Sequence, residues 1–147
     1  MTGTVARDEL NNDSHSNRGQ IGDEWAGSLP IPITESLLKR GQERFGIFCA
    51  TCHGLGGVGD GMVSRRADQL QEGTWTPPTD LTSSVVVERP DGHLFNTITH
   101  GIRNMPAYGP QIDPADRWAI VAYLRALQKS RNATLADVPE SIRPTLQ

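Results

Sequence analysis

The segment Cys49-Ala50-Thr51-Cys52-His53 limits what this chain can become more than any other part of its sequence. It holds both cysteines of the chain. Two thiols separated by two residues can each bond to one vinyl group of a single haem, and the histidine that follows is then placed to bind the iron. The motif therefore predicts one covalent haem c, attached through Cys49 and Cys52, with His53 as an axial ligand.

Two other uses of a cysteine pair fit the sequence less well. A structural zinc site needs four ligands, and the remaining histidines, His15, His93 and His100, are scattered along the chain. A thioredoxin-like redox pair needs βαβ patterning, which the sequence lacks. Haem attachment requires only the motif itself and a second axial ligand further along.

Composition supports a small cofactor-centred domain. The chain has 147 residues, only 36% of them hydrophobic, with 15 glycines and 10 prolines. A large apolar macrocycle would compensate for so small a core. The net charge of −3 gives no basic surface for nucleic acid. No apolar run approaches the roughly 18 residues that cross a bilayer.

Helical patterning predicts an all-α fold with three to five helices, because no segment alternates as a strand does. One helix is expected to begin after Thr34 and to run into Cys49, and residues 62–70 to form a short helix. Another should begin at Pro90-Asp91 and end before Gly101, and the clearest should follow Asp113-Pro114. We divide the chain into an extended N-terminal arm (residues 1–33), a haem domain (34–130) and a C-terminal tail (131–147).

The second axial ligand is predicted to be Met105. This methionine precedes Pro106 in a polar loop between two helices, which suits a ligand better than a core residue. Met62 is a weaker candidate because it follows the motif too closely to reach the opposite face of the haem. His100 would give bis-histidine ligation, whereas His93 is expected to face solvent.

Further residues are expected to surround the ligands. The carbonyl groups of the Pro77-Pro78 segment are the expected acceptors for the second ring nitrogen of His53. The other predicted haem contacts, among them donors to its propionates, are Trp75, Arg65, Arg66, Arg103 and Leu81.

The chain resembles the class I cytochromes c. The matching features stand in family order: the first helix, CATCH, PPTDL, the NMP loop and the final RWAIVAYLRAL. The resemblance implies the class I fold around one haem, in which the first and last helices cross. Carried over, Gly41 and Phe45 would meet Ile120 and Tyr123.

A narrower resemblance covers almost the whole chain. TVARDEL, LPIPITESLLKRGQERFGIFCATCHG, HLFNTITHGIRNMPAYGPQI and NATLADVP are similar to the monohaem cytochrome c subunit of bacterial alternative complex III. This resemblance implies an electron-transfer subunit, not itself an enzyme, on the periplasmic side of the inner membrane. Its partners would be other subunits of a membrane complex that oxidises quinol, and a terminal oxidase or soluble acceptor. The sequence alone also allows a free periplasmic electron shuttle, or a haem protein that binds ligands by displacing Met105.

Overall fold

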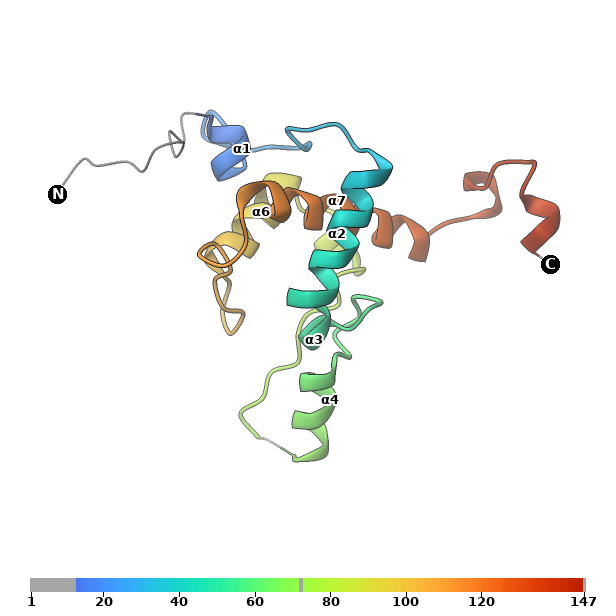
Figure 1. The fold of residues 1–147 in the computed structure, drawn as a ribbon. Coiled ribbons are helices and arrows are strands. Elements are labelled where there is room, and N and C mark those ends of the chain that lie inside the picture. The colour runs from blue at the N-terminus through green and yellow to red at the C-terminus, as the bar shows by residue number, and fades with distance from the viewer. Residues whose placement is uncertain (1–12, 72, 147) are drawn as a thin grey trace.

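A computed structural model describes residues 13–71 and 73–146. The fold is predominantly helical, with seven α-helices and two short 3₁₀ helices in the described residues (Figure 1). That is more than the three to five helices predicted, and the excess consists of short pieces at loops. The elements are α1 (Ser14–Arg18), β1 (Gln20–Ile21), β2 (Glu24–Trp25), α2 (Glu35–Phe48), α3 (Ala50–His53), α4 (Met62–Gln69), α5 (Ser84–Val87), α6 (Asp91–His100), α7 (Pro114–Arg131), η1 (Leu135–Asp137) and η2 (Arg143–Leu146).

The expectation of a purely α-helical chain is wrong in one detail. Strands β1 and β2 form an antiparallel hairpin with Gln20 opposite Trp25. The hairpin turns at Gly22-Asp23, and a glycine in the first position is typical of two-residue hairpin turns. Strands of two residues are too short to show the alternation by which strands are recognised.

Helices α2 and α7 form the centre of the fold and cross one another (Figure 1). Helix α2 begins where the Thr34 hydroxyl accepts a hydrogen bond from the Leu37 N–H. The Phe45 ring packs against Tyr123 at a centroid distance of 5.5 Å. Gly41 lies against the backbone of Ala119, one residue before the predicted Ile120. The crossing therefore brings the first large helix of the chain onto its last.

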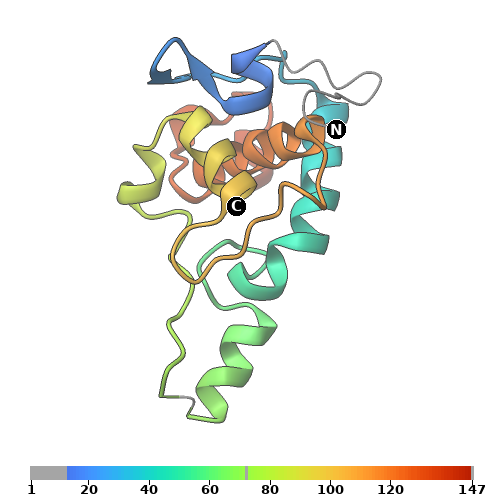
Figure 2. The same ribbon diagram turned by 90° about the vertical axis from the view of Figure 1, so that its left-hand side faces the viewer.

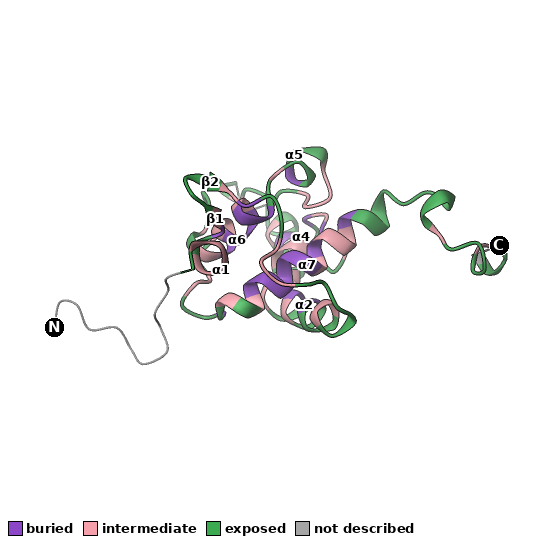
Figure 3. Cartoon of the chain, turned by 90° about the horizontal axis from the view of Figure 1, so that it is seen from above, coloured by how far each residue is buried: buried purple, intermediate pink, exposed green. Residues whose placement is uncertain are grey.

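The hydrophobic core follows α7, which is the most continuously buried element in Figure 3. Phe95 of α6 stacks on Trp118 of α7 with ring centroids 4.4 Å apart. Arg117 is also buried, and its guanidinium lies 4.7 Å above the Phe95 ring. The largest fully buried side chains are Trp118, Phe45, Phe95, Ile120 and Val121.

The described part of the N-terminal arm lies on α6 and α7. The Trp118 indole N–H donates to the Ser16 carbonyl at 2.8 Å, and the Gly92 N–H donates to the Ala26 carbonyl at 2.8 Å. From Asp13 onward the arm thus contains a helical turn and a hairpin, so it is not wholly extended. Residues 1–12 lie outside the described residues.

Helix α4 projects from the body as a separate lobe (Figures 1 and 2). The lobe begins and ends at one place, because Gly59 lies directly against the Pro78 carbonyl. Beyond α7 the chain continues through η1 and η2, away from the core (Figure 1). Among the described helices, none combines the length and apolar character needed to cross a membrane.

Candidate haem-binding site

The cysteine–histidine motif forms a single helical turn at the end of α2. The Cys49 N–H donates to Phe45 as the last bond of α2, and the His53 N–H donates to the Cys49 carbonyl at 2.8 Å. Helix α3 therefore continues α2 with almost no break. In this conformation Cys49 and His53, four residues apart, lie on one face, with Cys52 beside them.

The electrostatics of Cys49 argue against a thiolate function. Burial, with a smaller effect from Cys52, raises the pKa of the Cys49 thiol to about 12. A thiol that stays protonated at neutral pH is a poor metal ligand and a poor redox nucleophile. Across residues 13–71 and 73–146, no three His, Cys, Asp or Glu side chains gather as a metal site would require. Within the described residues, the cysteine pair thus lacks the further ligands that a structural zinc site needs.

His53 has the environment of a neutral imidazole. Burial lowers its pKa, and the backbone of Thr79 opposes that shift in part. A neutral ring is the form that binds a metal ion. Its Nδ1 is buried and makes no hydrogen bond of good geometry with the described residues. The backbone group that raises the pKa of the imidazole thus belongs to Thr79, the residue after the predicted acceptor Pro78. The carbonyl of Pro78 itself lies against Gly59.

The loop that carries Met105 is closed and anchored. Ile102 and Met105 exchange both backbone hydrogen bonds, at 3.1 and 2.9 Å. Gly101 has φ +74°, and a side chain there would collide with the Met105 carbonyl, so only glycine fits. Beyond the turn, the Tyr108 N–H donates to the Ile98 carbonyl at 2.9 Å, which ties the loop to α6. Met105 is half-buried within this fixed turn.

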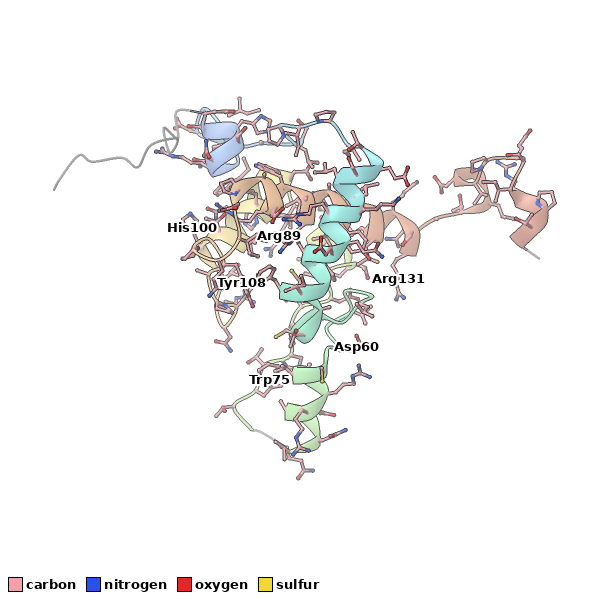
Figure 4. All side chains as sticks on the ribbon, in the orientation of Figure 1. Asp60, Trp75, Arg89, His100, Tyr108 and Arg131 are labelled. Atoms are coloured by element: carbon pink, nitrogen blue, oxygen red, sulfur yellow. The ribbon has the colours of Figure 1, made fainter. Side chains whose placement is uncertain are left out.

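Tyr108 places the loop beside the motif. Burial raises its pKa, and the electrostatic influence of Cys52 and Cys49 raises it further, so the tyrosine lies within electrostatic reach of both cysteines. Its ring also packs edge-on against Phe48, at a centroid distance of 6.2 Å. Figures 2 and 4 show the loop alongside the end of α2 and α3. Met105 is three residues from this contact.

Comparison with known proteins agrees with this arrangement. Residues 36–124 match the family model described as cytochrome C oxidase, cbb3-type, subunit III. The chain belongs to this cytochrome c family. Membership implies a covalent haem c and electron transfer through it.

The individual proteins that are similar to this cytochrome c match it over only part of their own length. The cbb3-type cytochrome c oxidase subunit FixP of Azorhizobium caulinodans is 33% identical over 90 residues, which are 60% of this chain and 27% of FixP. The chain thus spans about a quarter of that relative's length. A chain of the Kuenenia stuttgartiensis reducing HAO-like protein complex is similar with a TM-score of 0.53 and 20% identity, over 78% of this chain and 54% of that one. At that identity the likeness concerns the fold alone.

The other ligand candidates of this cytochrome c lie in less suitable places. Met62 begins the projecting helix α4 and is 71% exposed. His100 ends α6 and is exposed. His93 does not face solvent as predicted, because it is half-buried with its ring 5.6 Å from that of Trp25. The hairpin of β1 and β2, which covers His93, is not evident from the sequence.

Trp75 has a feature that suits a haem propionate. Its indole Nε1 is buried and has no hydrogen-bond partner in the described residues. An unpaired buried donor is costly unless a bound group satisfies it. Trp75 lies at the base of the α4 lobe (Figure 4), where an apolar cavity of about 460 Å³ separates it from α4. By contrast, the predicted propionate ligands Arg65, Arg66 and Arg103 are exposed.

A haem fits these residues on three counts: two cysteines in one helical turn, a neutral imidazole, and a buried indole donor without a partner among the described residues. Leu81, the remaining predicted contact, is half-buried against the core. Sequence reasoning missed Tyr108 and Thr79, because nothing in the local pattern shows that their segments fold back onto residues 49–53.

Proposed function

We propose that the chain binds a single haem c and transfers one electron at a time between redox proteins, with His53 and Met105 as its axial ligands. The observation that carries the proposal is the closed Ile102–Met105 turn, anchored through Tyr108 beside the two cysteines. When bound, the haem supplies the redox chemistry by alternating between ferrous and ferric iron.

The protein's own residues would hold the haem rigidly and keep water away. Cys49 and Cys52 would attach it, and the helical turn of α3 would fix His53 below it. A methionine in a turn closed by two backbone hydrogen bonds has little freedom to move between oxidation states. Soft thioether ligation also favours the reduced iron. With His53 and Met105 both bound to the iron, a substrate would have no place on it, so the chain would act as an electron carrier.

The proposed setting is a quinol-oxidising respiratory complex similar to alternative complex III, on the periplasmic side of the membrane. Support comes from the sequence resemblance and from the arm, which folds onto α6 and α7 and leaves Ile21 and Ile33 exposed. A free shuttle has little use for such a structure. The similarity to FixP makes a subunit of a cbb3-type oxidase the second candidate.

The absorption spectrum of the oxidised protein tests the ligands. A weak band at the red end, from sulfur bound to iron, should be present in the wild type and lost in Met105→Ala. Met62→Ala is the matched control and should keep the band. Rapid carbon monoxide binding to the reduced wild type would instead favour a ligand-binding protein. A wild-type spectrum without the band would exclude methionine ligation.

Cross-linking in native membranes tests the setting. Adducts between the arm and subunits of a quinol-oxidising complex would support the first assignment. Adducts with oxidase subunits would support the second, and a protein recovered free from all membrane subunits would indicate a shuttle.

A further inference from the structure

A buried amide connects α7 to the segment beside His53. Gln128 is only 4% exposed, and both the nitrogen and the oxygen of its amide make hydrogen bonds. Its Nε2 donates to the Leu81 carbonyl at 2.7 Å, and its Oε1 accepts from Arg125 at 2.8 Å. Burying an amide is unfavourable unless its hydrogen bonds are made. The buried Gln128 amide thus depends on a backbone carbonyl 47 residues earlier in the chain.

Arg125 extends this connection along the same segment. Its guanidinium donates to the Val87 carbonyl at 2.9 Å and to the Asp91 carboxylate at 2.6 Å, and it also bonds the Arg89 carbonyl (Figure 4 labels Arg89). Gln128 and Arg125 together fasten residues 81–91 to α7.

The strap Pro78–Leu81 is held from its other side by the loop that follows His53. The Leu81 N–H donates to the Gly57 carbonyl at 2.8 Å. In that same loop the Gly59 N–H donates to the carbonyl of His53 itself, at 2.8 Å. Gly59 also lies against the Pro78 carbonyl. The strap is thus clamped between α7 and the residues next to the imidazole.

We infer that Gln128 is a positioning residue for His53: by holding Leu81 it fixes the strap that is clamped to the loop after His53 and whose backbone would supply the acceptor for the second ring nitrogen. The inference rests on the proposed function, because it concerns His53 as a haem ligand. An acceptor for the second ring nitrogen orients a ligating histidine and makes it a stronger donor to the metal. A stronger donor favours ferric iron, so releasing the strap should raise the reduction potential.

The test compares two variants of α7 that each lose one side-chain bond to a backbone carbonyl. Gln128→Met keeps the length and volume of the side chain but removes its bonds to the Leu81 carbonyl and to Arg125. Trp118→Phe removes the 2.8 Å bond to Ser16 at the other end of the helix and serves as the control. Both holoproteins are measured for reduction potential by spectroelectrochemistry. Exchange of the His53 ring N–H proton is followed by NMR in the reduced state.

Gln128→Met should raise the potential and accelerate ring N–H exchange by roughly tenfold, the factor that corresponds to about 1.4 kcal/mol. Trp118→Phe should change neither. If Gln128→Met yields no holoprotein, Gln128→Asn tests the same point, because its amide is one methylene too short to reach Leu81.

Two results would overturn the inference. One is a wild-type potential and exchange rate in the Gln128 variant. The other is an equal change in Trp118→Phe, which would indicate general loosening. Failure of the proposed function is distinguishable, since it would show in the wild type as a missing haem or a missing sulfur–iron band.

Discussion

A β-carbon on Gly41 would lie 2.0 Å from the carbonyl oxygen of Ala119 and 2.7 Å from the β-carbon of Tyr123. Helices α2 and α7 therefore touch backbone to backbone, with no room for even a methyl group. Glycine in a helix interior costs about 1 kcal/mol relative to alanine. The close crossing offsets that cost, because it brings the rings of Phe45 and Tyr123 together.

Gly41→Ala should lower the free energy of unfolding by about 3 kcal/mol, because the helices would have to separate. Gly46→Ala is the matched control, since Gly46 is on the same helix, is exposed, and a β-carbon there meets nothing within 4 Å. That control should be neutral or stabilising by up to about 1 kcal/mol. Denaturant unfolding of the holoproteins measures both, and equal stabilities would refute the close crossing.

Asp91→Asn should destabilise the fold by about 3 kcal/mol, because it leaves the Arg125 guanidinium without its anionic partner. The two groups are 2.6 Å apart with side chains 9% and 24% exposed. Glu35→Gln breaks the exposed pair with Lys39 and should cost less than about 0.5 kcal/mol. Chemical denaturation compares them. A similar, small loss in both variants would show that the buried pair contributes little.

The start of the tail should respond to acid. Hydrogen bonds from Lys129, and then from Thr134, lower the pKa of the Asp137 carboxyl from its ordinary 3.8 to about 2. A lowered pKa means that the contribution of Asp137 to stability is complete above pH 3.8 and is lost as the pH falls through about 2. The Thr134 amide, which donates to Asp137 at 2.8 Å, should shift in NMR spectra over that range. In Asp137→Asn the shift should be absent, and its persistence would assign it to another group.

Trp75→Phe should lower the reduction potential of the holoprotein. Losing the buried indole donor leaves a propionate more negative, and negative charge near the iron stabilises its ferric state. Trp25→Phe is the control and should leave the potential unchanged, because Trp25 belongs to the arm and packs on His93 of α6. Spectroelectrochemistry measures both, and an unchanged potential in Trp75→Phe would mean that the indole serves no propionate.

The long helices could be predicted closely from the sequence. Thr34 caps a helix that runs over Glu35–Phe48, and Asp113-Pro114 opens one that runs over Pro114–Arg131. These elements are specified by short-range features: a capping side chain, a proline at the first turn, and apolar residues at helical spacing. The haem motif is equally local, and for that reason it could be recognised without a structure.

Contacts between distant segments could not be predicted in the same way. Gln128 reads as one more polar residue at the end of a helix, and only the folded chain shows that its amide meets Leu81. Tyr108 likewise gives no sign in the sequence that it lies beside Cys49 and Cys52. The arm is polar and lacks periodicity, yet its described part folds because Trp118 and Gly92 donate hydrogen bonds to its backbone carbonyls.

Helix α7 supplies a partner to three earlier parts of the chain: Trp118 to the arm, Ala119 to α2 and Gln128 to the strap. None of these regions can complete its packing before the residues of α7 have been synthesised. A growing chain would therefore keep both thiols of the motif accessible for haem attachment until α7 has been made. The order of elements thus delays tertiary closure and leaves time for covalent maturation.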